Sequence, residues 1–237
     1  MSAWQKAVPT LEKPIELRLL LNKRLAELEQ TSEALAEAAE VPIAYIEDLL
    51  SGNRPPLRPG RSDLYDRMAS FLKIALSDIE ACAKFELPDP STSKPRMPKP
   101  AIRSVFLDLC DPKSARKLEA RRAKNGPAEL IGFIQRVLDV VHREVRRSLA
   151  DRVGLRLQAR HSGKAYEVAR VEVLEFLDAT AATLTATEVS KFVQPRIAKW
   201  DIDVDTGVLR VVMRGQEPAG RRPRPLDQTD RQPRSSK

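Results

Sequence analysis

Two short helical segments separated by Val41 and Pro42 make residues 31–54 the most constrained stretch of this chain. Before the break, small apolar residues recur at helical spacing, so one face admits a second helix at close range. Proline suits the first turn of a new helix because its missing N–H group has no partner there. Gly52 then stands where a helix C-terminus is commonly capped. The pattern predicts two helices joined by a tight turn, and the second helix is expected to bury Tyr45, Ile46 and Leu49.

The stretch TSEALAEAAEVPIAYIEDLLSGNR resembles the Cro/repressor-type helix-turn-helix of the xenobiotic-response-element family. The residues that carry the resemblance are Thr31, Leu35, Ala36, Ala39, Val41, Tyr45, Ile46, Leu49, Gly52 and Arg54. The similarity extends over residues 15–87, where SDLYDRMASFLKIALSDIE resembles the closing helices of the family. It implies an N-terminal five-helix, lambda-repressor-like domain that binds double-stranded DNA, regulates transcription and places its second motif helix in the major groove.

The resemblance implies residues that face the bases and residues that hold the DNA backbone. Arg58 and Arg61 are expected to join the second set, because their loop lies next to the path of the DNA backbone. The residues expected to face the bases are Ile43, Ala44, Glu47 and Asp48. The residues expected to hold the DNA backbone are Thr31, Ser32, Ser51, Asn53, Arg54, Arg58 and Arg61. The chain departs from the family at Ser32, where glutamine is common, and at Glu40, where glycine is common. A glutamate adopts a left-handed turn conformation less comfortably than glycine does.

The expected base-facing set contains no cation and no amide. Its carboxylates can accept hydrogen bonds from cytosine, and its apolar side chains can touch a thymine methyl group. The same acids repel phosphate, and the arginines of the proline-rich loop after Gly52 are expected to offset that repulsion. Two alternatives remain open: a protein-interaction module that uses the acidic helix-turn-helix surface, and a nonspecific architectural nucleic-acid binder.

Composition favours a mainly α fold, because glycine is scarce and strong helix formers are abundant. A formal charge of +8 fits a polyanionic partner. Cys82, Cys110 and the two histidines lack metal-ligand spacing, and no catalytic motif is present, so we expect no metal, no cofactor and no enzyme activity. The N-terminus lacks the apolar core of a signal peptide, and no apolar run has membrane-spanning length. We therefore expect a cytoplasmic protein that does not enter a membrane.

Proline content divides the chain. We predict a flexible arm at 1–12, the helix-turn-helix domain at 13–87, a Pro/Lys-rich linker at 88–101, a second helical domain with a C-terminal β-hairpin at 102–214, and a disordered basic tail at 215–237. The second domain is expected to dimerise or to sense a signal that the sequence does not identify. In line with the resemblance, we expect a homodimer that represses by occupying its operator. A dimer implies a two-fold operator, because the symmetry of the protein sets the spacing of the half-sites.

Within 102–214, the charged run KSARKLEARRAKNG is expected to be exposed, and a long amphipathic helix is predicted from Pro127 to about Asp151. A turn or short strand is expected at 152–163, followed by a helix from Lys164 to about Thr180. Thr185 and Glu188 form a predicted capping box, and a hairpin is predicted to turn at 205–207. His142 is interpreted as a structural or surface histidine, and the aspartates at 201, 203 and 205 as a solvated strand face.

Overall fold

The computed structural model describes residues 15–87 and 97–214. These residues are mainly helical, with one antiparallel hairpin near residue 214, as the composition and periodicity predicted. The predicted arm at 1–12, the predicted tail at 215–237 and residues 88–96 of the predicted linker lie outside the described residues. Within the described residues, no helix combines the length and apolar character needed to cross a membrane.

The N-terminal unit, residues 15–87, consists of five helices: α1 Leu17–Glu27, α2 Ser32–Ala39, α3 Ile43–Ser51, α4 Leu64–Leu72 and α5 Leu76–Glu86. All five contribute to one apolar core. Its fully buried side chains include Leu17, Leu21, Leu35, Ile46, Leu64, Met68, Leu72 and Ile79. Five helices in this span are the number that the family resemblance implied.

Local sequence explains the break between α2 and α3. The Thr31 hydroxyl accepts a hydrogen bond from the Ala34 amide at 3.3 Å, which caps α2. Glu40 follows α2 in the left-handed conformation at φ 56°, so the chain reverses within two residues. At the other end of α3, Gly52 adopts φ 77°, where a side chain is strained. Both predicted motif helices are present, and Tyr45, Ile46 and Leu49 are buried as expected.

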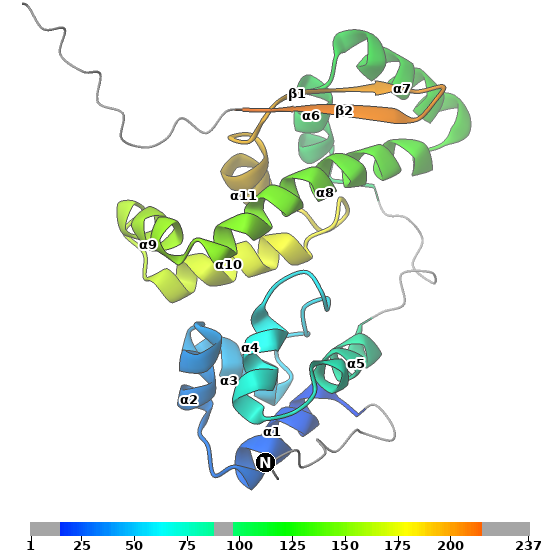
Figure 1. Cartoon of the computed structure of the whole chain (residues 1–237). Helices are drawn as coiled ribbons and strands as arrows, with labels where there is room; N and C mark the ends of the chain where they lie inside the picture. Colours follow the sequence, from blue (N-terminus) through cyan, green and yellow to red (C-terminus); the bar gives the residue numbers. More distant parts are fainter. Residues whose placement is uncertain (1–14, 88–96, 215–237) are drawn as a thin grey trace, which may run out of the picture.

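The C-terminal unit, residues 97–214, contains a helical layer and a hairpin. Its elements are α6 Pro100–Asp108, α7 Pro112–Asn125, α8 Ala128–Ala150, α9 Arg152–His161, α10 Tyr166–Asp178, α11 Ala186–Glu188, the π-helix η1 Val189–Val193, β1 Ile197–Asp203 and β2 Val208–Met213. The long helix α8 runs across the unit and packs against α10 on one side and the hairpin on the other (Figure 1). Helix α6 begins within the stretch predicted as linker, because Pro100 fits a first helical turn.

Trp200 of β1 anchors the hairpin to the helices. Its side chain is fully buried, and its indole N–H donates to the Phe106 carbonyl at 2.7 Å. The backbone of Trp200 also bonds to Leu109 and Asp111, at 2.9 and 2.8 Å. The free backbone edge of β1 is therefore partly paired by the α6–α7 connection. The predicted hairpin turn and the Thr185–Glu188 capping box are both confirmed.

Residues 152–163 were predicted as a turn or short strand, and this prediction is wrong, because residues 152–161 form α9. Gly154 does not break this helix, since the Asp151 carboxylate accepts a hydrogen bond from its amide at 2.9 Å. The basic run in α7 is also not wholly exposed, because Leu118 and Ser114 are buried. The Ser114 hydroxyl donates to Asp201 at 2.6 Å, so this aspartate bonds to α7 and is not simply solvated.

Candidate functional site

The outer face of α3 carries the residues expected to face DNA bases. Ile43 is 37% exposed, Ala44 and Glu47 are exposed, and Asp48 is half-buried. The opposite face of the helix packs into the core of the N-terminal unit through Tyr45. The four residues thus share one surface, and that surface is apolar and acidic.

The small polar residues expected to hold the DNA backbone lie at the ends of the motif helices. The Thr31 hydroxyl is engaged as the α2 cap, and the Ser51 hydroxyl donates to the Asp48 carbonyl at 3.2 Å. Asn53 is exposed and Ser32 is half-buried. These side chains border the α3 face.

The three loop arginines are placed differently, because each is bonded to the C-terminal unit. Arg54 forms an ion pair with Glu175 of α10 and lies 4.7 Å above the Tyr45 ring. The Arg58 backbone N–H donates to the Asp178 carboxylate at 2.6 Å, and its guanidinium donates to the Asp178 carbonyl at 3.2 Å. The expected phosphate-contacting arginines therefore already have acceptors within the chain.

Arg61 completes this set of contacts. Its guanidinium lies 3.7 Å from the Asp139 carboxylate of α8. We refer to the surface where α8, α9 and α10 meet α2, α4 and the α3–α4 loop as the junction (Figure 1). No sequence pattern predicted it, because its partners lie more than 75 residues apart in the chain.

Glu40 is the centre of a second group of junction contacts. Its carboxylate lies 3.2 Å from the Arg67 guanidinium and also forms an ion pair with Arg152 at the start of α9. It accepts a hydrogen bond from the Tyr166 hydroxyl at 2.7 Å. The contacts explain why a glutamate occupies a left-handed turn position that suits glycine: its side chain joins the two units. The unusual residue at this position was the one sequence signal that could have located the junction.

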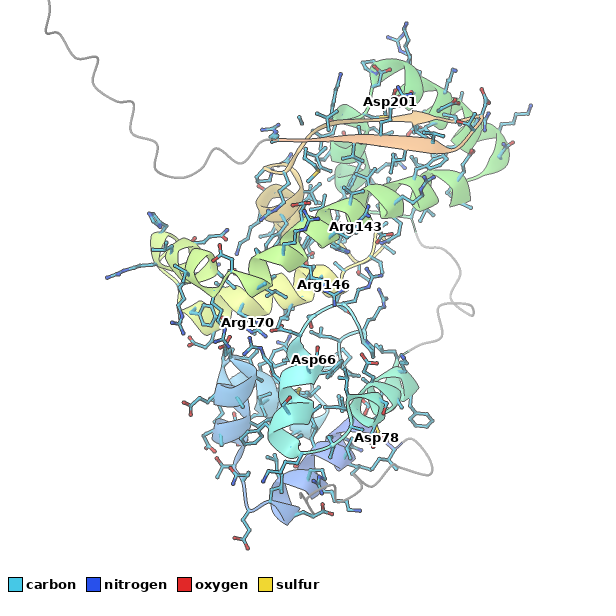
Figure 2. The ribbon with its side chains drawn as sticks, in the orientation of Figure 1. Asp66, Asp78, Arg143, Arg146, Arg170 and Asp201 are labelled. Atoms are coloured by element: carbon cyan, nitrogen blue, oxygen red, sulfur yellow. The ribbon has the colours of Figure 1, made fainter. Side chains whose placement is uncertain are left out.

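Arg170 of α10 is fully buried at the junction, on the side of α10 that faces the N-terminal unit (Figure 2). Its Nε atom donates to the Ala39 carbonyl at 3.3 Å and one terminal nitrogen donates to the Asp63 carboxylate at 2.8 Å. Burial raises the pKa of Asp63, but Arg67 and Arg170 together outweigh burial and hold that pKa below its usual range. Asp63 is therefore held in its charged form between two guanidinium groups.

The junction leaves several buried polar atoms without a hydrogen-bond partner. In the described part of the chain these are the Tyr45 hydroxyl, Arg54 Nε, one terminal nitrogen of Arg170 and both ring nitrogens of His142. Tyr45 lies under Arg54, and the His142 ring meets the Phe176 ring of α10 edge-on at 4.9 Å. All of these atoms lie at or beside the junction, and none lies in the core of the N-terminal unit away from it.

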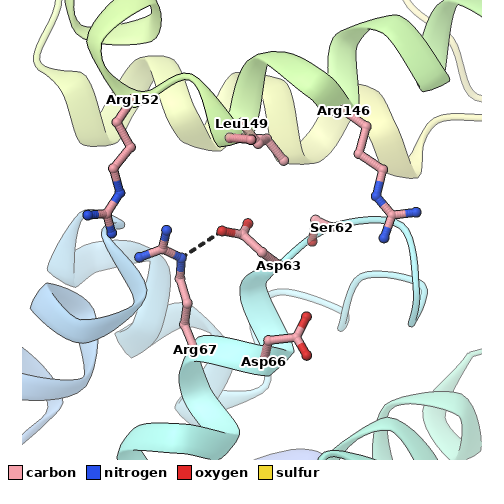
Figure 3. A pocket seen from close by; sticks show the side chains of 8 residues that line it. Ser62, Asp63, Asp66, Arg67, Arg146, Leu149 and Arg152 are labelled. Atoms are coloured by element: carbon pink, nitrogen blue, oxygen red, sulfur yellow. Dashed lines mark hydrogen bonds and ion pairs between the residues drawn. The ribbon is translucent and has the colours of Figure 1, made fainter.

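A cavity of about 270 Å³ separates the two units beside this network. Figure 3 shows Arg146, Leu149 and Arg152 on its upper wall, and Asp63, Asp66 and Arg67 among the residues of its lower wall. The junction is thus charged and incompletely packed.

The two units differ in charge. Residues 15–87 contain 9 Lys and Arg against 13 Asp and Glu, a formal charge of −4, whereas residues 97–214 contain 22 against 15, a charge of +7. The basic character of the described chain therefore resides in the C-terminal unit and not in the helix-turn-helix.

Comparison with protein-family models, curated proteins and solved structures gave no match. In the described residues no group of three or more His, Cys, Asp or Glu side chains is placed to hold a metal ion. The residues that sequence reasoning missed are those that build the junction from the C-terminal side: Asp139, Arg152, Tyr166, Arg170, Glu175 and Asp178.

Proposed function

We propose that the protein is a non-catalytic, cytoplasmic transcriptional regulator of the Cro/repressor type, which binds double-stranded DNA as a homodimer and represses by occupying its operator. The observation that carries the proposal is the α2–α3 arrangement with the outer face of α3 exposed. A short helix that is anchored on one side and free on the other fits the width of the major groove.

The chemistry of that face favours particular bases. A carboxylate at Glu47 or Asp48 accepts a hydrogen bond from the cytosine amino group, and Ile43 or Ala44 contacts the thymine methyl group. Such contacts discriminate between sequences but add little affinity, because the acids repel phosphates. Affinity comes from cations elsewhere, including the loop arginines and the C-terminal unit.

A protein-docking function is the second candidate, and the charge of the N-terminal unit favours it. A unit of charge −4 with acids on an exposed helix suits a basic protein partner better than a polyanion. The two candidates predict different consequences of removing the acids of α3.

Selection of bound sequences from a random duplex pool at near-physiological salt tests the main proposal. We expect an enriched, two-fold-symmetric motif, and we expect Glu47→Ala with Asp48→Ala to change the motif. Glu80→Gln on α5, away from the α3 face, is the matched control and should leave the motif unchanged. If no motif is enriched and the double alanine variant abolishes capture of a basic protein partner, the docking function replaces DNA binding.

A further inference from the structure

The acceptors that hold the loop arginines are chemically equivalent to those that DNA offers. Glu175 and Asp139 present carboxylate oxygens to Arg54 and Arg61, and Asp178 presents both its carboxylate and its carbonyl to Arg58. Phosphate oxygens bind the same guanidinium N–H groups with the same geometry. One arginine cannot direct the same N–H groups at both acceptors, so the two sets of contacts exclude each other.

Ion pairs between partly exposed side chains contribute to the closed junction. Arg54 and Glu175 keep 31% and 42% of their side-chain surface exposed, and Arg61 and Asp139 keep 38% and 46%. Ion pairs with this much exposure are weak and are screened by salt. Arg170 is fully buried at the junction, and one of its terminal nitrogens has no hydrogen-bond partner in the described residues.

Unpaired buried donors make closure costly. Tyr45 and Arg54 each bury a polar atom that has no hydrogen-bond partner in the described residues, and such unpaired groups weaken an interface. The cavity beside Arg146 and Asp66 shows the same incomplete fit between the two units. The junction therefore combines one buried ion pair, several partly exposed ion pairs and buried polar atoms that lack a partner in the described residues.

We propose that the C-terminal unit autoinhibits DNA binding: its acids on α8 and α10 occupy the loop arginines, and DNA phosphates displace them when the junction opens. This inference rests on the proposed DNA-binding function. Because only the open form offers the arginines to DNA, the apparent affinity is reduced by the fraction of molecules that are closed. Any change that weakens the junction without altering the N-terminal unit therefore tightens DNA binding.

The test is the double variant Glu175→Gln with Asp178→Asn, which changes only the C-terminal unit. The variant loses the partly exposed Arg54–Glu175 ion pair and weakens the hydrogen bond from the Arg58 backbone N–H to the residue 178 side chain, so we expect DNA affinity to rise roughly three- to tenfold at fixed salt. Glu167→Gln is the matched control on the same helix, because Glu167 is exposed and forms no ion pair in the described residues. The control should leave DNA affinity unchanged.

Opening is followed separately by energy transfer between dyes at cysteines introduced in place of Ser70 on α4 and Gln158 on α9, both exposed. We expect transfer to change in the same direction on adding salt, on adding DNA and in the double variant without DNA. If DNA binds the wild-type chain and the double variant equally, or binds without a change in transfer, autoinhibition is overturned while DNA binding stands. If no variant binds duplex DNA although transfer reports opening, the proposed function itself fails.

Discussion

The N-terminal unit presents two surfaces of opposite character. The outer face of α3 is apolar and acidic and largely exposed, and within the described residues none of its side chains forms a hydrogen bond or ion pair with the C-terminal unit. The α3–α4 loop carries Arg54, Arg58 and Arg61, and each of them is bonded to α8 or α10. In a protein that binds DNA through both surfaces, the face that contacts bases is available while the arginines that bind phosphate are occupied.

The contrast between the α3 face and the junction distinguishes residues whose replacement should change binding from residues whose replacement should change stability. A side chain on the α3 face has no partner in the described chain, so its replacement changes the folded state little. A side chain at the junction is bonded across two units, so its replacement weakens their association whatever the protein binds. The following predictions test this separation, from the largest expected effect to the smallest.

Arg170→Ala should have the largest effect, because Arg170 is fully buried and bonds both Asp63 and the Ala39 carbonyl. Removing one partner of a buried charge pair destabilises by about 3 kcal/mol. The measurement is the free energy of unfolding in urea. Arg160→Ala, at an exposed site on α9, is the control and should change that free energy by less than about 0.5 kcal/mol. Equal effects of the two substitutions would show that Arg170 does not join the units.

His142→Phe should alter the pH dependence of stability. Burial, and secondarily the Arg61 charge, lower the pKa of His142 from 6.5 to about 4, against the opposing effect of Asp139. Because the folded state binds its proton at lower pH than the unfolded state does, stability is lost as pH falls from about 6.5 to about 4, by up to roughly 3 kcal/mol. Phenylalanine cannot bind a proton and packs against the same Phe176 ring.

The check is the melting temperature at pH 7, 5.5 and 4.5. We expect the difference between pH 7 and pH 4.5 to be smaller in His142→Phe than in the wild-type chain. His161→Gln, at an exposed site, is the control. An unchanged pH dependence in His142→Phe would mean that this histidine is not buried in its neutral form.

Two substitutions of Glu40 separate the free-energy cost of its left-handed backbone from the stabilisation by its side-chain contacts. Glu40→Ala keeps the strained φ and loses the contacts with Arg67, Arg152 and Tyr166. Glu40→Gly loses the same contacts but relieves the strain, so it should be more stable than the alanine variant by about 1 kcal/mol. The measurement is again urea unfolding.

Lys73→Gly provides the reference for that comparison. Lys73 has a similar φ of 53°, its side chain is exposed, and it makes no ion pair in the described residues. Glycine there should raise stability by up to about 1 kcal/mol. If Glu40→Gly stabilises the chain as much as Lys73→Gly does, the Glu40 contacts contribute nothing.

Glu47→Ala should have the smallest effect on stability, within about 0.5 kcal/mol, because Glu47 is exposed and unpaired in the described residues. The same change is expected to alter the preferred DNA sequence. Circular-dichroism melting measures the first effect. A loss well above 1 kcal/mol would place this face among the stabilising surfaces and remove the distinction between the two surfaces.

Local patterns in the sequence were sufficient to predict the local structure. The α2–α3 break, the capping box at Thr185 and the hairpin turn each depend on residues within a few positions of one another. The prediction failed at residues 152–163, where glycines at both ends indicated a turn. The Asp151 carboxylate, three residues before Gly154, supplies the cap that keeps this stretch helical.

The junction was beyond prediction for a different reason. The residues near Arg54 in the sequence include no obvious partner for its guanidinium group. Its partner Glu175 lies 121 residues further along the chain. Charge patterning identifies candidate phosphate contacts but not the acids that compete for them. Glu40 alone signalled the junction, because a residue poorly suited to its backbone conformation is retained when its side chain is used elsewhere.

The most direct test of the closed junction is hydrogen exchange at the Arg58 backbone amide. This amide lies in a loop, and its acceptor is the Asp178 carboxylate of the C-terminal unit, at 2.6 Å. We predict that the amide is protected in the wild-type chain, and that Asp178→Ala or high salt brings its exchange close to the rate of an exposed loop. Exchange at the exposed-loop rate in the wild-type chain at low salt would contradict the closed junction and the regulation derived from it.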